Sequence, residues 1–260
     1  MEKEILIFGH KNPDTDSICS AMVKERLNKK NGYDSSVAVR LGNINKETQY
    51  VLNYLNLEAP ELKEEVAEGQ KVIMVDHNEF NQSIKGIEKA KILGVVDHHR
   101  IANFETSDPL YYTARPYGCT STILFQDFKG KGIEINREEA ILMASAIISD
   151  TLLLKSPTTT KHDEKALEEL EKIAGIDIKE YGLEMLKAGT DLDDFTAKEL
   201  INLDAKELDK NGIKFVIGQV NTVDIPSVLE RQEELEKAIE EELKEKELAL
   251  FVLAITDILN

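Results

Sequence analysis

The stretch Ile92-Leu93-Gly94-Val95-Val96-Asp97-His98-His99 decides the fold, because it is an apolar run that ends in one carboxyl and two imidazole side chains. A short β-branched run without helical spacing predicts a strand that is buried on both faces, as in a parallel sheet. Open α/β sheets bind their ligands at the carboxyl ends of such strands. The polar triplet therefore lies where a ligand is expected.

Two further apolar runs end in the same way. Residues 4–9 lead into His10, and residues 71–75 lead into Asp76 and His77. One strand that ends at an acid is ordinary, but three that end at Asp or His, in a chain with five histidines, indicate a metal site. Strand and helix patterns alternate along this part of the chain, which predicts an α/β fold with a parallel sheet and helices on both of its faces.

The length of 260 residues allows two domains. We expect a first domain over residues 1–188, a linker over 189–194 and a smaller α/β domain over 195–260. In this last part the pattern predicts one amphipathic helix from about 226 to 246, with strands on either side. In the first domain, a helix is expected over 18–27, with Ser17 as its N-cap.

Composition limits the partners and the location. The formal net charge of −17 argues against a protein that binds the backbone of nucleic acids, although bound divalent cations can still attract a small anion. No apolar stretch reaches the roughly 18–20 residues that span a bilayer. There is no visible signal peptide, and Cys19 and Cys119 form no CxxC pair, so we expect a cytoplasmic protein without a membrane partner.

Six side chains are candidate metal ligands: His10, Asp14, Asp16, Asp76, His98 and Asp150. Four converging carboxylates would repel one another, and divalent cations remove that repulsion. A mixed set of oxygen and imidazole ligands suits Mn, Fe, Co or Zn better than Mg. Six ligands exceed one tetrahedral zinc site and fit two metals that share a carboxylate. For the loop 10–16 alone, a plainer interpretation also stands, in which its aspartates cap the next helix.

Several motifs resemble a known family. Four of them are similar to the motifs of the DHH phosphoesterase superfamily, and the chain closely resembles the manganese-dependent family II inorganic pyrophosphatases over nearly its whole length. The four motifs are Gly9-His10-Lys11-Asn12-Pro13-Asp14-Thr15-Asp16-Ser17, Val75-Asp76-His77-Asn78-Glu79, Asp97-His98-His99 and Ser149-Asp150-Thr151. The segments Gly118–Thr122, Lys155–Thr160, Leu203–Glu207 and Gln219–Asp224 resemble the same family.

The resemblance implies a reaction and a role for each residue. The reaction would be hydrolysis of pyrophosphate to two phosphates by a hydroxide that bridges two divalent metals. The cofactors would be two Mn²⁺ (or Co²⁺) per subunit, with additional Mg²⁺ or Mn²⁺ arriving with the substrate. One metal would be bound by His10, Asp14 and Asp76, and the other by Asp16, Asp76, His98 and Asp150. His99 and Lys206 would contact the substrate and act in catalysis together with Asp76, and Asp97 would orient an imidazole.

The resemblance also implies how the protein assembles, and in one respect this sequence differs from the family. Residues 1–188 would be the DHH metal-binding catalytic domain, which also forms a homodimer, and residues 195–260 a partial substrate-binding domain of the DHHA2-like kind. Family members carry Ser-Arg-Lys-Lys-Gln near the C-terminus, and this sequence reaches Asn260 without it. The missing cations are expected to reduce activity. Two alternatives stay open: a DHH-type phosphodiesterase for short oligonucleotides or cyclic dinucleotides, and a catalytically weak metal-binding truncation.

Overall fold

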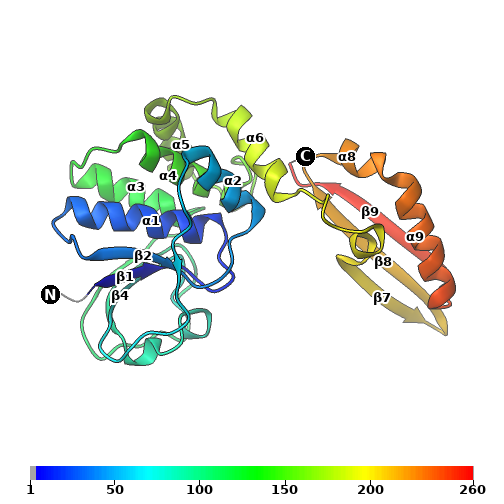
Figure 1. The fold of residues 1–260 in the computed structure, drawn as a ribbon, viewed down its shortest axis with the longest axis horizontal. Coiled ribbons are helices and arrows are strands. Elements are labelled where there is room, and N and C mark those ends of the chain that lie inside the picture. Colours follow the sequence, from blue (N-terminus) through cyan, green and yellow to red (C-terminus); the bar gives the residue numbers. More distant parts are fainter. Residues whose placement is uncertain (1–3, 260) are drawn as a thin grey trace. The chain divides into compact units, whose positions relative to one another are not determined.

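The computed structural model describes residues 4–259 and consists of two compact units, Met1–Met185 and Leu186–Asn260 (Figure 1). The expectation about a signal peptide concerns in part residues 1–3, which lie outside the described residues. Within the described range, no helix has both the length and the apolar character that a membrane crossing requires. The predicted linker, residues 189–194, begins at the last residue of a helix, and the division between the units lies within that helix.

The N-terminal unit is built on a six-stranded sheet in the order β3-β2-β1-β4-β5-β6, and every neighbouring pair is parallel. This confirms the predicted α/β class. The strands are β1 (Ile5–Phe8), β2 (Ser36–Arg40), β3 (Glu61–Leu62), β4 (Lys71–Val75), β5 (Lys91–Asp97) and β6 (Tyr111–Ala114). All four residues of β1 are buried, as are four of the five in β4, because both faces of the sheet are covered.

Different structures cover the two faces. Helices α1 and α3 contact one face, and α4 packs on both of these helices (Figure 1). The other face packs against the segments around two short 3₁₀ helices, η1 (Phe80–Gln82) and η2 (Ile87–Lys89), and alternate strand residues such as Leu6 and Phe8 belong to that core. Side chains alternate between the faces of a strand, so β1 contributes to both cores. The helices are α1 (Thr15–Lys30), α2 (Lys46–Leu55), α3 (Thr120–Gly130), α4 (Arg137–Thr151), α5 (Lys161–Ala174) and α6 (Ile178–Gly189).

The start of α1 differs from the prediction. The N-cap is Asp14 and not Ser17, since the Asp14 carboxyl accepts a hydrogen bond from the Ser17 backbone N–H at 2.9 Å. The helix therefore begins at Thr15, three residues earlier than expected. Aspartate and serine are both good N-caps, and the apolar pattern from Ile18 onward does not distinguish them.

The C-terminal unit contains a three-stranded sheet in the order β7-β8-β9, with β7 antiparallel and β9 parallel to β8. Its elements are α7 (Ala197–Asn202), β7 (Asp204–Lys210), β8 (Ile213–Thr222), α8 (Ile225–Glu230), α9 (Gln232–Glu245) and β9 (Leu250–Asp257). The single helix expected over 226–246 is wrong, because Arg231 separates α8 from α9. Arg231 donates to the carbonyls of Leu192 and Phe195 at 3.0 and 2.8 Å, so the break attaches the helices to the linker.

Candidate metal centre

The structure brings the six candidate ligands together at the carboxyl end of the sheet. His10 follows β1, Asp76 follows β4 and His98 follows β5, whereas Asp150 comes from the last turn of α4 and Asp16 from the first turn of α1. Their ligand atoms form two groups within which all atoms lie within 4.8 Å of one another. The first group is His10, Asp14 and Asp76, and the second is Asp16, Asp76, His98 and Asp150.

Asp76 belongs to both groups. Its side chain is 1% exposed, Oδ2 lies 3.4 Å from His10 Nε2, and Oδ1 lies 3.4 Å from His98 Nε2. Its φ of 58° is in the left-handed region, which costs free energy in residues other than glycine and is found mainly at functional sites. The buried Oδ2 accepts no hydrogen bond from any described residue. A buried carboxylate oxygen without a hydrogen bond is free to bind a cation.

The two imidazoles are oriented as metal ligands. His10 Nδ1 donates to the Lys11 carbonyl at 2.7 Å, and His98 Nδ1 donates to the Tyr117 carbonyl at 3.0 Å. A carbonyl oxygen only accepts, so each Nδ1 carries the hydrogen and each Nε2 faces the carboxylates. Ligating histidines commonly use their other ring N–H in this way, which fixes the tautomer. The two Nε2 atoms are therefore directed at the centre of the cluster.

Hydrogen bonds also hold the two aspartates of the α1 start. Asp14 Oδ1 caps the helix, while Asp14 Oδ2 lies 3.4 Å from His10 Nε2, so capping does not use the oxygen that faces the cluster. Asp16 accepts from Ser20 Oγ at 2.6 Å and from the backbone N–H groups of Thr120 and Ser121 at 2.8 and 3.3 Å. These two N–H groups lie at the start of α3, where the helix dipole favours a negative charge.

Protons bound by the carboxyl and imidazole groups reduce the repulsion between the carboxylates of the cluster. Burial and the nearby Asp76 carboxylate raise the pKa of Asp16 to about 6, and burial together with neighbouring carboxylates raises the pKa of Asp150. Burial lowers the pKa of His10, but the carboxylates outweigh this effect and raise it to about 11. His98 shows the same balance, and its pKa rises to about 9. The donor set of four carboxylates and two imidazoles thus fits two divalent cations that would replace these protons.

The second histidine of the Asp97-His98-His99 triplet is oriented differently. Asp97 Oδ1 accepts hydrogen bonds from both the backbone N and Nδ1 of His99 at 3.0 Å, and Asp97 Oδ2 accepts from Asn78 Nδ2 at 2.6 Å. The imidazole that Asp97 orients is therefore that of His99. Its side chain is 51% exposed and borders a cavity of about 500 Å³, whose wall includes Tyr117 and the candidate ligand Asp150.

The loop that supplies the Tyr117 carbonyl is itself held in place. Asp163 accepts from the Gly118 backbone N–H at 2.9 Å and from Thr122 Oγ1 at 2.6 Å. A Cβ at position 118 would lie 2.9 Å from both Asp163 Oδ2 and Thr151 Cγ2, so any other residue would have to displace one of these side chains. The sequence analysis gave the segment Gly118–Thr122 only as a family resemblance, and it missed the supporting role of Asp163.

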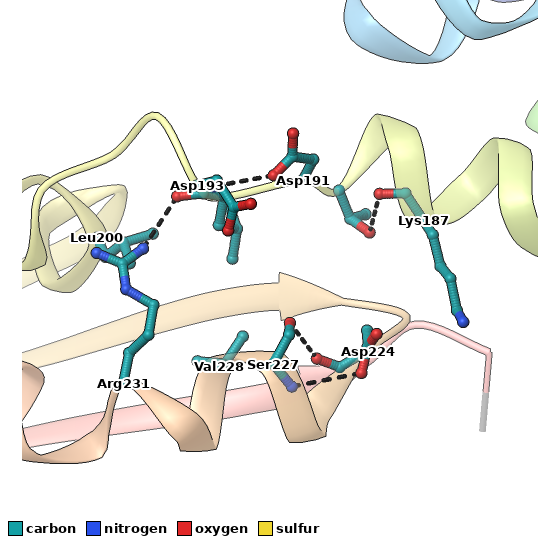
Figure 2. A pocket seen from close by; sticks show the side chains of 10 residues that line it. Lys187, Asp191, Asp193, Leu200, Asp224, Ser227, Val228 and Arg231 are labelled. Carbon is teal, nitrogen blue, oxygen red and sulfur yellow. Dashed lines mark hydrogen bonds between the residues drawn. The ribbon is translucent and has the colours of Figure 1, made fainter.

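One sequence-predicted site residue belongs to the other unit. Lys206 belongs to β7 of the C-terminal unit, is exposed, and pairs with Ile217 of β8. The C-terminal unit also contains a smaller cavity of about 200 Å³ (Figure 2). Asp224, which borders this cavity, caps α8 through the Ser227 backbone N–H at 3.3 Å, and Arg231 binds linker carbonyls. Asp224 and Arg231 thus stabilise the local fold.

Comparison with known proteins first defines the class. Residues 4–147 match the DHH family, N-terminal domain, and residues 183–260 match the DHHA2 domain. An exopolyphosphatase-related protein from Bacteroides fragilis has a similar fold, with a TM-score of 0.57, 14% sequence identity and coverage of 91% of this chain and 68% of that chain. At that identity the likeness concerns the fold alone.

More similar relatives define the family. The manganese-dependent inorganic pyrophosphatase of Bacillus subtilis (strain 168) is 57% identical over 261 residues, which cover 100% of this chain and 84% of the relative. A crystal structure described as that of a family II inorganic pyrophosphatase from Methanococcus jannaschii has a TM-score of 0.71 and 41% identity, and the match covers 97% of this chain and 83% of that one. The chain belongs to the family of manganese-dependent inorganic pyrophosphatases.

Manganese affinity is expected to rise with pH. His10 and His98 have raised pKa values and hold protons at neutral pH, and Asp16 holds one below about pH 6, so binding must displace them. Mn²⁺ binding should therefore release protons, and the dissociation constant should fall between about pH 6 and pH 8. Calorimetry in buffers of different ionisation enthalpy measures both quantities. Equal affinity at the two pH values without proton release would contradict this electrostatic description.

Proposed function

We propose that this chain hydrolyses inorganic pyrophosphate to two phosphates with the help of Mn²⁺. The observation that carries the proposal is the pair of ligand groups that share the buried carboxylate of Asp76. Family membership supports it, since the Bacillus subtilis relative at 57% identity is a manganese-dependent inorganic pyrophosphatase. The relatives' names refer to pyrophosphate and not to oligonucleotides, so the phosphodiesterase alternative is not proposed.

The six ligands would bind the cations in two sets. His10, Asp14 and Asp76 would hold one, and Asp16, Asp76, His98 and Asp150 would hold the other. When bound, the cations supply a water molecule activated near neutral pH and positive charge for the phosphate oxygens. Cobalt is the other metal we propose for these sites, and additional Mg²⁺ or Mn²⁺ would come with the substrate.

His99 is proposed as a catalytic contact with the substrate. Its Nδ1 is bonded to Asp97, and this hydrogen bond raises the pKa of His99. A protonated His99 would present its Nε2–H toward the cavity, where it can donate to a phosphate oxygen, and charge-assisted bonds of this kind are among the stronger ones. Asp97 thereby keeps the donor in a single orientation.

The test of the reaction is phosphate release from pyrophosphate after incubation with Mn²⁺ and in the presence of Mg²⁺, with a dinucleotide as the parallel substrate. We expect phosphate release from pyrophosphate alone. The variant His98→Ala should lose one of the two metal equivalents and the hydrolysis. Release from the dinucleotide only, or full Mn²⁺ stoichiometry in His98→Ala, would overturn the proposal.

Lys206 is proposed as a second cationic contact with the substrate. Its side chain is exposed on β7, and it contributes no ligand atom to the metal groups of the N-terminal unit. Lys206→Ala is therefore expected to leave Mn²⁺ affinity unchanged and to lower kcat/KM about 100- to 1,000-fold, the usual effect of removing one such donor. Lys214→Ala, another exposed lysine of the same sheet, is the matched control. Equal kinetics for both variants and the unmodified chain would show that Lys206 makes no useful contact.

We also propose a cytoplasmic homodimer without nucleic-acid or membrane partners. The two free cysteines support the cytoplasm, and the net charge of −17 disfavours nucleic acid. The dimer is proposed to form through the N-terminal domain, residues 1–188. Strand β6 lies at the edge of the sheet, and its Tyr111 is 88% exposed. An edge strand offers unpaired backbone groups to a second copy, and an isologous contact closes a two-fold dimer.

Sedimentation velocity tests this assembly. The unmodified chain is expected to sediment as a dimer, and Tyr111→Lys should shift it toward the monomer because a charge would enter the contact. Tyr33→Lys replaces another exposed tyrosine, outside the sheet edge, and should leave the dimer intact. A monomeric unmodified chain, or a dimer unaffected by Tyr111→Lys, would refute the proposed interface.

A further inference from the structure

Helix α2 brings a glutamate between the two helix ends that carry metal-facing aspartates. Glu47 Oε1 accepts from Thr15 Oγ1 and from Ser149 Oγ, both at 2.5 Å. Thr15 stands between Asp14 and Asp16 at the start of α1, and Ser149 directly precedes Asp150 in the last turn of α4. One carboxylate oxygen thus links two segments that are more than 100 residues apart in sequence.

The surroundings of Glu47 hold this link in one geometry. Thr15 is fully buried, and its hydroxyl also lies 3.1 Å from Thr48 Oγ1, the residue after Glu47. Helix α2 contacts both α1 and α4, so Glu47 lies at the junction of the three helices. A hydroxyl that donates to a carboxylate forms a charge-assisted bond, which is shorter and stronger than a neutral one. Two such bonds to one atom fix the distance between the two hydroxyls.

We propose that Glu47 is a positioning residue that holds the Asp16 and Asp150 carboxylates at their separation for the metal group formed with Asp76 and His98. The inference rests on the proposed metal centre and extends it to a residue that contributes no ligand atom to either group. Two of the four members of this group, Asp16 and Asp150, are sequence neighbours of a Glu47 partner. Only Asp14 of the other group has such a neighbour, and it is already held by its helix cap.

Mn²⁺ titration of the full-length chain by calorimetry tests the proposal. Glu47→Ala is expected to weaken one of the two binding steps about 10- to 100-fold, the usual effect of losing a group that orients a ligand. Glu47→Gln keeps an acceptor oxygen and should restore most of that affinity. A Gln variant as weak as the Ala variant would mean that charge and not position is responsible, and would overturn the inference.

A matched control is available on the same pair of helices. Glu138 in the first turn of α4 forms an ion pair with Arg26 of α1, so it also links α4 to α1, at the end remote from Asp150. Glu138→Ala is expected to leave both Mn²⁺ steps unchanged. Equal weakening in Glu138→Ala and Glu47→Ala would show a general effect of loosened helices and would refute the positioning role.

The hydroxyl partners complete the test. If Glu47 acts through Ser149, then Ser149→Ala weakens the same step, and the double variant Glu47→Ala/Ser149→Ala is no weaker than Glu47→Ala alone. Additive losses would overturn the inference. If Glu47→Ala does not fold, the Mn²⁺ affinities are compared instead for Glu47→Gln combined with Ser149→Ala and Thr15→Val, which removes both hydroxyl donors.

Mn²⁺ binding by the unmodified chain distinguishes a failure of the proposed metal centre from a failure of the proposed role of Glu47. If the unmodified chain does not bind two Mn²⁺, the proposed metal centre fails and this inference with it. If it binds two and Glu47→Ala binds them with unchanged affinity, only the role of Glu47 is refuted.

Discussion

The constraint on which this structure depends is the close approach of four carboxylates at the carboxyl end of a parallel sheet. Asp14, Asp16, Asp76 and Asp150 lie in two overlapping groups with ligand atoms within 4.8 Å. Burial, together with the neighbouring carboxylates, raises the pKa values of Asp16 and Asp150, because charged carboxyl groups are disfavoured at such distances without cations. The fold stabilises an arrangement that is unfavourable by itself, and it does so at the point where the ends of three parallel strands converge.

The arrangement is maintained because the atoms that face away from the cluster are hydrogen-bonded. Asp14 uses one oxygen to cap α1, His10 and His98 use Nδ1 on carbonyls, and Asp16 receives the N–H groups at the start of α3. Each side chain therefore enters the cluster in one orientation. Preorganisation of this kind lets a site bind cations without first ordering its ligands. Glu47 extends the same principle, since it contacts the neighbours of ligands and not the ligands themselves.

Much of this could be predicted from the sequence, because the signals were local. Apolar runs that stop at His10, Asp76 and Asp97 identified three strands and the carboxyl end of the sheet, where the candidate ligands lie. The loop residues Asp14 and Asp16 stood close to the first of these strands. The parallel order of the strands then brought these side chains together.

Other features depended on contacts that no local pattern reveals. Strand β7 is mostly charged and exposed, and it forms because Asn211 and Gly212, with φ of 59° and 79°, turn the chain into a hairpin with β8. The break at Arg231 depends on carbonyls about forty residues earlier in the chain. Glu47 has the sequence environment of an ordinary surface glutamate in a first helical turn. Its role follows only from the packing of α2 against α1 and α4.

Backbone strain shows how the metal groups and the core depend on each other. Asp76 is left-handed at φ 58°, Asn12 between His10 and Asp14 is left-handed at 53°, and residues 152–154 after Asp150 have φ of 48°, 53° and 65°. Left-handed backbone costs about 1–2 kcal/mol per residue for side chains such as those of Leu152–Leu154, and less for Asp and Asn. The conformation of Asp76 persists because this residue is itself buried directly after the buried strand β4, whereas Leu152–Leu154 are half-buried after helix α4 and Asn12 is exposed. The core therefore maintains both the strained backbone and the repulsion between the carboxylates. Cation binding at the carboxyl end of the sheet would relieve that repulsion, so it is thermodynamically coupled to the stability of the N-terminal unit.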